Sequence, residues 1–244
     1  MSPRTVVHRP ETFTIKINDV DVSAQADQTV LQVARENGID IPSLCNLEGL
    51  SAWGGCRLCL VEVLPHGKLM PACTTACYQQ MEVVTHSQRL EAYRKTILEL
   101  MFAERNHVCS VCVSNGHCDL QAMAVKLGVT HIHVPYRFPS LSVDSSHDQF
   151  RLDHNRCILC SRCVRVCDEI EGAHTKDIMG RGIDCLVVND LATPWGDSDT
   201  CTSCSKCVHV CPTGALTEKG TSAGEMAKRR KFLPYLSLMR EDDR

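Results

Sequence analysis

Two similar cysteine runs lie in the second half of this chain, and they constrain its fold more than any other feature. CILCSRCVRVC begins at residue 157 and CTSCSKCVHVC begins at residue 201. Each run reads Cys-x2-Cys-x2-Cys-x3-Cys, a bacterial iron–sulfur spacing in which three thiolates of a run bind one cubane and the fourth binds the other. The spacing therefore predicts two crossed [4Fe-4S] sites. One consists of Cys157, Cys160, Cys163 and Cys211, and the other of Cys167, Cys201, Cys204 and Cys207.

The cysteine count indicates metal sites rather than disulfides. Seventeen of 244 residues are cysteine, an odd number, and close Cys-x2-Cys pairs form disulfides only with strain. The N-terminus lacks the charged-then-apolar pattern of a signal peptide, and no apolar run approaches the roughly 18 residues of a membrane span. We expect a cytoplasmic protein with reduced thiolates and no membrane span. Zinc ribbons are the alternative for the cysteine groups.

Charge and aromatic content narrow the possible partners and the size of the core. The formal net charge is −3, so the chain offers no basic field for nucleic acid. Only 5% of the residues are aromatic. We expect several small modules that fold around their metals rather than one large apolar core.

The first module has the pattern of a small mixed sheet with one helix. Residues 12–18 alternate between polar and apolar, as in a half-buried strand, and residues 58–64 and 81–86 predict two further strands. A helix is predicted from Thr29, which can cap its start, to Asn37, with Gly38 at its left-handed end.

Four cysteines of this module are spaced x10, x2 and x13, and two glycines precede the second of them. Four thiolates suit a [2Fe-2S] cluster, and glycines allow the backbone N–H groups to approach sulfur closely. A zinc ribbon normally has two Cys-x2-Cys pairs, whereas this group has one. The predicted ligands are Cys45, Cys56, Cys59 and Cys73.

A third group follows an amphipathic helix predicted over residues 88–104. It has only three cysteines, Cys109, Cys112 and Cys118, and a cubane needs four ligands, so an imidazole is expected to supply the fourth. His107 and His117 are the candidates, and His107 is favoured because it lies outside the loop that the thiolates close. A cluster open at one iron and a zinc site are the alternatives.

The remaining features carry weaker predictions. A short helix is expected from Asp119 to Gly128, and residues 131–150, rich in proline and serine, predict an irregular connector. Cys77 and Cys185 are left over as buried, unligated thiols. Beside the first run, Arg156, Arg162 and Arg165 would favour a reduced cluster if they lie near it, although such arginines are commonly solvated. The tail from residue 221 is apolar near its end and is expected to dock on another subunit.

The order of these motifs resembles a known arrangement. CNLEGLSAWGGCRLC, LMPAC, NHVCSVC with GHCDLQ, PYRFP and the double run look like the N-terminal electron-transfer region of the complex I large peripheral subunit and of [FeFe]-hydrogenases. They also look like the small diaphorase subunit of NAD-reducing nickel–iron hydrogenases. That subunit is favoured because this chain stops at residue 244 and because AERNHVC has arginine at position 105, where the other two families have their ligand histidine.

This resemblance implies an α+β fold with three iron–sulfur domains. They are a 2Fe-2S ferredoxin-like (β-grasp) domain over 1–87, a small helical His/Cys3 4Fe-4S domain with its connector over 88–148, and a double 4Fe-4S ferredoxin-type domain over 149–220. The tail covers 221–244. The resemblance also implies that His107, Cys109, Cys112 and Cys118 hold the third cubane, which makes one [2Fe-2S] and three [4Fe-4S] clusters in total.

The implied function is electron relay without bond chemistry in an H2:NAD+ oxidoreductase (hydrogen dehydrogenase). The implied partners are the FMN- and NAD-binding diaphorase large subunit and the small and large subunits of the nickel–iron hydrogenase. FMN, NAD and nickel are expected in those partners. The alternatives are the same relay in an NAD-dependent formate dehydrogenase or a complex I-like NADH dehydrogenase, an iron–sulfur sensor, and a zinc interaction module.

Overall fold

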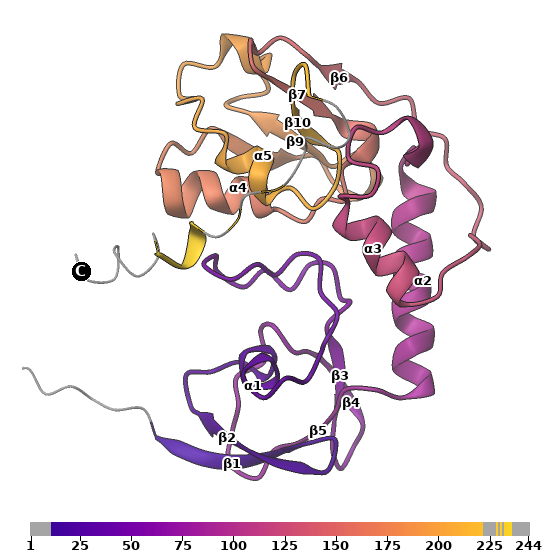
Figure 1. The fold of residues 1–244 in the computed structure, drawn as a ribbon, viewed down its shortest axis with the longest axis vertical. Coiled ribbons are helices and arrows are strands. Elements are labelled where there is room, and N and C mark those ends of the chain that lie inside the picture. The colour runs from indigo at the N-terminus through magenta and orange to yellow at the C-terminus, as the bar shows by residue number, and fades with distance from the viewer. Residues whose placement is uncertain (1–10, 222–227, 229, 231, 236–244) are drawn as a thin grey trace, which may run out of the picture. The chain divides into compact units, whose positions relative to one another are not determined.

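The computed structural model describes residues 11–221, 228, 230 and 232–235. By compactness the chain divides into two units, of which the first comprises residues up to 43 together with 57–92, and the second comprises 44–56 and the residues from 93 onward. The mixture of sheets and helices confirms the α+β class (Figure 1). Among the described residues, no helix combines the length and the apolar character that a membrane span requires.

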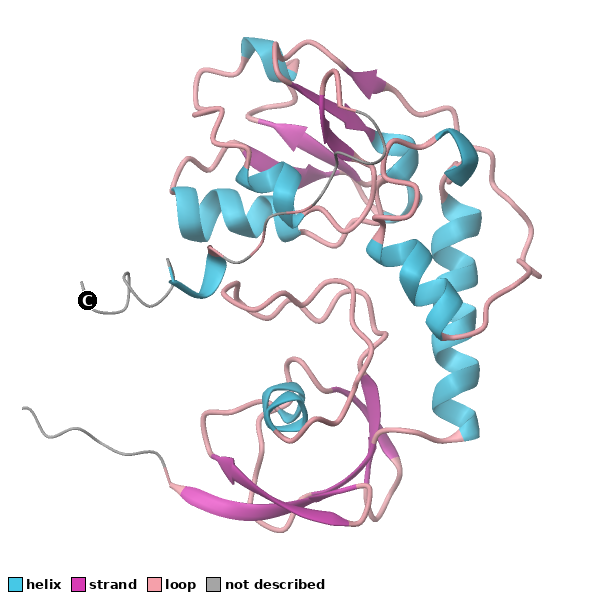
Figure 2. Ribbon diagram, in the orientation of Figure 1, coloured by secondary structure: helices cyan, strands magenta, loops and turns pink. Residues whose placement is uncertain are grey.

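A five-stranded sheet forms the first unit. Its strands follow the order β2-β1-β5-β3-β4, and Figure 2 shows the sheet curving around one helix, α1. Strands β1 and β2 are antiparallel, whereas β1 and β5 are parallel, which makes the sheet mixed as predicted. The strands are β1 (Thr12–Ile17), β2 (Val20–Gln25), β3 (Leu60–Val63), β4 (Lys68–Pro71) and β5 (Glu82–Val84).

The helix of this unit, α1 (Val30–Glu36), forms where the sequence predicts it. The Thr29 side chain accepts a hydrogen bond from the Gln32 backbone N–H, and the Gln32 side chain accepts one from the Thr29 backbone N–H. This capping box satisfies two backbone donors at the start of the helix. Gly38 has φ +70°, the left-handed conformation that ends the helix. The buried face of α1 packs with the sheet into one apolar core.

The second unit holds the double cysteine run. One three-stranded sheet has the order β10-β7-β6, and a separate hairpin joins β8 and β9. The predicted connector over 131–150 is irregular except for β6 and the first residue of β7. The strands are β6 (Val143–Asp144), β7 (Phe150–Asp153), β8 (Lys176–Met179), β9 (Leu186–Asn189) and β10 (Leu216–Glu218).

The helices of the second unit flank the cysteine groups. The longest, α2 (Gln88–Glu104), matches the predicted bounds, with Leu90 and Leu98 fully buried and Tyr93 exposed. The boundary between the units falls inside α2, after residue 92. The other helices are α3 (Asp119–Lys126), α4 (Arg162–Arg165) and α5 (Lys206–Val210), and a π-helical turn, η3 (Val166–Glu171), continues α4.

The predicted docking tail lies mostly outside the described residues. Within the described part, Leu233 is buried in the core of the second unit and Phe232 packs against that core. The Arg230 side chain donates to Asp119 and to the Cys211 carbonyl. These described residues of the tail therefore contact their own chain.

Candidate iron–sulfur sites

The first crossed set of cysteines surrounds one cavity of the second unit. Its empty volume, which includes space open to solvent, is about 340 Å³. Three of its cysteines come from the first run, while Cys211 comes from the end of the second run, followed by Pro212. The thiols that line this cavity are Cys157, Cys160, Cys163 and Cys211.

The second crossed set lines another cavity, also with an empty volume of about 340 Å³. Here Cys167 from the end of the first run joins three cysteines of the second run. The apolar wall includes Phe150 and Trp195. The thiols that line this cavity are Cys167, Cys201, Cys204 and Cys207.

The two runs adopt the same local backbone, and this places the ligands. Leu159 and Ser161 in the first run, and Ser203 and Ser205 in the second, all have positive φ between 52° and 61°. Residues other than glycine rarely adopt this conformation, and such residues cluster at functional sites. The left-handed serines immediately precede α4 and α5. Each run thus lines one cavity with its first three cysteines and the other cavity with its fourth cysteine.

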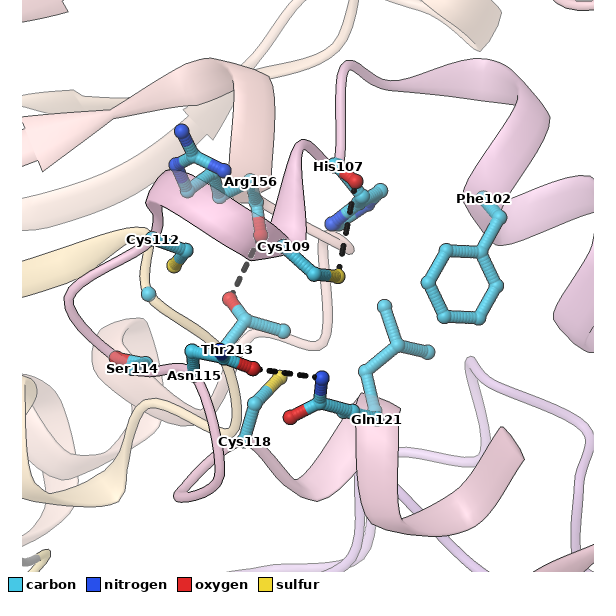
Figure 3. Close-up of a pocket in the computed structure, with 12 residues that line it drawn as sticks. Phe102, His107, Cys109, Cys112, Ser114, Asn115, Cys118, Gln121, Arg156 and Thr213 are labelled. Atoms are coloured by element: carbon cyan, nitrogen blue, oxygen red, sulfur yellow. Dashed lines mark hydrogen bonds between the residues drawn. The ribbon is translucent and has the colours of Figure 1, made fainter. Parts of the chain in front are cut away.

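The third cavity brings His107 together with three cysteines (Figure 3). Its empty volume is about 310 Å³. The Phe102 ring of α2 meets the His107 ring edge-on with centroids 5.4 Å apart, and Gln121 of α3 lies on another side. The candidate ligands that line the cavity are His107, Cys109, Cys112 and Cys118.

His107 has the properties of a metal-binding imidazole. Burial, followed by the charges of Arg156 and Arg105, lowers its pKa to about 4, so the imidazole is neutral at pH 7 and retains a lone pair. Its Nε2 atom is buried without a hydrogen-bond partner among the described residues. His117, the alternative ligand, is not part of this cavity wall. The geometry therefore supports His107 over His117.

The four cysteines of the N-terminal group occur as two pairs, one in each unit. On the 44–56 segment of the second unit, the Cys45 backbone N–H donates to Cys56 Sγ at 3.4 Å, and the Leu44 N–H donates to the same sulfur at 3.5 Å. In the first unit, the sulfur atoms of Cys59 and Cys73 lie 3.4 Å apart. All four thiols are buried. These N–H···S contacts come from Leu44 and Cys45 rather than from the two glycines before Cys56, so the expected role of the glycines stays a prediction.

Burial favours the neutral form of the thiols at these sites, so their ligation to iron requires a compensating positive charge. Burial raises the pKa of Cys157 and Cys207 to about 12 and that of Cys160 and Cys118 to about 11. Without a compensating positive charge these groups are neutral thiols, whereas iron binds thiolates. Buried, closely grouped thiols and an unpartnered imidazole nitrogen fit iron–sulfur clusters, in which iron supplies that charge.

Zinc sites and cubane sites differ in the arrangement of their ligands. All sulfur ligands of a single zinc ion bind the same ion, each with a Zn–S distance of about 2.3 Å. Cubane ligands bind separate iron atoms and need not converge in this way. Among the described residues, no group of three or more His, Cys, Asp or Glu side chains converges on one metal ion.

The three arginines near the first run have specific roles that their positions in the sequence did not reveal. Arg156 lines the His107 cavity and binds Asp153 and the Val108 carbonyl. Arg162 and Arg165, both buried, donate to backbone carbonyls of the 44–56 segment. They are structural anchors as well as charges.

Two leftover cysteines lie outside the three cavities. Cys77 is buried in the apolar core of the first unit, and burial raises its pKa to about 11, as expected of an unligated thiol. Cys185 is only partly buried, contrary to the prediction, because it ends a surface turn. Its carbonyl accepts from Arg105.

Three families of iron–sulfur domains match successive parts of the chain. Residues 10–88 match the 2Fe-2S iron-sulfur cluster binding domain. Residues 94–133 match the NADH-ubiquinone oxidoreductase-G iron-sulfur binding region. Residues 148–217 match the ferredoxin-like domain of NADH-quinone oxidoreductase subunit 3. Together they confirm the predicted classes and order of the domains.

Whole proteins and a solved structure are also similar. The gamma subunit of the NAD-reducing hydrogenase HoxS of Cupriavidus necator is 32% identical over 91% of this chain and 93% of its own length. A putative formate dehydrogenase of Bacillus subtilis is 33% identical over 86% of the chain but 21% of its own length. A crystal structure of NAD+-reducing [NiFe]-hydrogenase contains a chain with a TM-score of 0.83 and 33% identity, over 92% of this chain and 96% of that one.

Proposed function

This chain belongs to the family of the NAD-reducing hydrogenase gamma chain, and we propose that it relays electrons inside an H2:NAD+ oxidoreductase. In this proposal a nickel–iron hydrogenase module, with its small and large subunits, delivers electrons to the chain. The chain passes them to a subunit that binds FMN and NAD. It is an oxidoreductase component that makes and breaks no substrate bond itself.

One observation carries the proposal: three cavities of one compact unit are each lined by a single predicted ligand set. We assign one cubane to each of these cavities and a [2Fe-2S] cluster to the cysteine group matched by the 2Fe-2S domain family. The binuclear ligands are Cys45, Cys56, Cys59 and Cys73. The cubane ligands are His107, Cys109, Cys112 and Cys118; Cys157, Cys160, Cys163 and Cys211; and Cys167, Cys201, Cys204 and Cys207.

The residues of the chain contribute burial, position and charge. When bound, iron–sulfur clusters accept and donate single electrons, which divides a two-electron hydride reaction into separate steps. Apolar walls such as Leu152 and Val187 in the first cavity exclude water from the ligands. His107 is a neutral ligand, so it gives its site one negative charge less than four thiolates would. Its cluster is therefore expected to have a higher potential than an all-thiolate cubane in the same surroundings.

A second candidate is the same relay in an NAD-dependent formate dehydrogenase or a complex I-like enzyme. The similarity to the Bacillus subtilis protein and to the two NADH oxidoreductase domain families favours it. The hydrogenase assignment has stronger support, because the Cupriavidus necator protein and the solved hydrogenase chain are matched over nearly their whole length.

Isolation of the native complex under anaerobic conditions tests the proposal. One binuclear cluster and three cubanes are expected to give about 14 iron atoms per chain, with equal acid-labile sulfide. Nickel and FMN are expected in co-purifying subunits. Molybdenum in place of nickel would assign the chain to a formate dehydrogenase, and zinc without sulfide would overturn the electron-transfer function.

A further inference from the structure

The cavity of the second crossed set contains a buried lysine that the assignment of ligands does not use. Lys176 begins β8, is 4% exposed, and lines the cavity together with Cys167, Cys201, Cys204 and Cys207. Its ammonium group donates to Asn189 Oδ1 at 2.7 Å, from the residue paired with it on β9. It also lies 3.5 Å from the centroid of the Trp195 ring.

This ammonium group has no carboxylate partner among the described residues. Its contacts are the amide oxygen of Asn189 and the face of Trp195, neither of which carries a charge. Asp144 and Asp190 lie close enough to interact electrostatically with Lys176, but neither forms an ion pair with it among the described residues. Asp144 accepts from Ser146 and from the Trp195 backbone, and Asp190 accepts from Thr200. A buried ammonium group without a direct ion-pair partner is unfavourable, and an anionic cluster in the same cavity would stabilise it.

Trp195 links the lysine to the ligand thiols. The ring is 1% exposed, and its indole N–H donates to Cys201 Sγ at 3.2 Å. The ring is held in place by stacking on Phe150, with centroids 5.4 Å apart. The indole thus directs a hydrogen bond at one ligand sulfur while its face contacts the ammonium group of Lys176.

We propose that Lys176 is the counter-ion of the cubane held by Cys167, Cys201, Cys204 and Cys207, and that Lys176 and Trp195 together raise its reduction potential. The proposal rests on the ligand assignment above. A cubane with four thiolates is an anion, and reduction adds one further negative charge. A buried ammonium group and an N–H···S hydrogen bond both stabilise the reduced form more than the oxidised form.

Potentiometric titration of the complex, followed by EPR, tests both residues. Lys176→Met removes the charge at nearly constant length, and Trp195→Phe keeps the ring but removes the N–H donor. Lys206→Met is the matched control, because Lys206 lines the same cavity but is more exposed and is paired with Glu171. A Cys204→Ser variant identifies the EPR signal of this cubane.

Both test variants are expected to shift the midpoint potential of this one cubane to more negative values. The shift is expected to be larger for Lys176→Met than for Lys206→Met, with the other three clusters unchanged. Full iron content with an unchanged potential in Lys176→Met, or an equal shift of every cluster, would overturn the proposal. If Lys176→Met does not assemble this cubane, Trp195→Phe decides, since an unchanged potential in that variant overturns the proposal. A wild-type iron count near ten would instead refute the ligand assignment.

Discussion

The guanidinium group of Arg165 donates a hydrogen bond of 2.6 Å to the backbone carbonyl of Cys45, a residue 120 positions earlier in the chain. The same side chain is 6% exposed and also donates to the carbonyls of Ser51 and Cys160 and to the Ser161 hydroxyl. One arginine of the ferredoxin-type run therefore joins the backbone of a proposed cubane ligand to the backbone of a proposed binuclear ligand.

Loss of this guanidinium is expected to release the 44–56 segment. Arg165→Met leaves buried carbonyls of Cys45 and Cys160 without their donor, and each unsatisfied group costs about 1–3 kcal/mol, so a total loss of about 3 kcal/mol is expected. Thermal unfolding and limited proteolysis of the segment measure the effect. Arg181→Met, which removes an exposed arginine, is the control, and equal stability of the two variants would contradict the anchoring role.

His107→Ala is expected to remove the cubane of the third cavity. The buried Nε2 of His107 has no other partner among the described residues, and the remaining three cysteines supply only three ligands. Iron content should fall by about 4 atoms per chain, with loss of one cubane EPR signal and persistence of the binuclear signal. His117→Ala is the matched variant and should keep all four signals. Loss of iron in His117→Ala, with an unchanged spectrum in His107→Ala, would reverse the assignment.

Gly214→Ala is expected to disturb the cubane of the His107 cavity, although Gly214 lies after the second cysteine run. A Cβ atom at this position would lie 2.5 Å from Cys112 Sγ, closer than real Cβ contacts allow, and 3.2 Å from Ser114 Oγ, which is also tight. The Cys112 thiolate must then move away from its iron. EPR and iron analysis should show partial or complete loss of this cluster. Gly128→Ala is the control: it strains a residue with φ +63° but meets no atom within 4 Å, so its iron content should be unchanged.

Acidification is expected to destabilise the second unit in part through His154. This histidine is buried, its Nδ1 has no partner among the described residues, and burial, followed by the charge of Arg105, lowers its pKa. The unfolded chain, with a histidine pKa near 6.5, therefore binds a proton before the folded chain does. Stability falls as the pH drops below about 6.5 and continues to fall until the lowered folded pKa is reached.

Melting temperatures between pH 8 and pH 5.5 measure this dependence. His154→Leu removes the titrating group, so its melting temperature should fall less over this interval than that of the wild type. Part of the fall should remain, because burial lowers the pKa of His147 in the same direction. Parallel curves for the variant and the wild type would exclude His154 as a source of the pH dependence.

Short-range features of this protein were predictable from its sequence. The thiol spacings, the capping box at Thr29 and the bounds of α2 all depend on residues close together in the chain. Even the crossed pairing of Cys167 and Cys211 follows from spacing, because each run repeats the same local geometry and places its fourth cysteine beyond the reach of its own cavity. The chemistry of iron and sulfur then restricts the class of protein, since few other centres use thiolates at these intervals.

Tertiary structure alone decided the surroundings of the ligands. Arg162 reaches the Asn46 carbonyl, and Gly214 meets Cys112, only because distant segments of the second unit pack together. Arg165 and Cys45 are partners across 120 positions. No local pattern encodes such contacts, because the position of a side chain relative to a distant segment depends on the packing of the whole unit. The sequence therefore determined which residues are proposed as cluster ligands, and the fold determined the charges and hydrogen bonds around them.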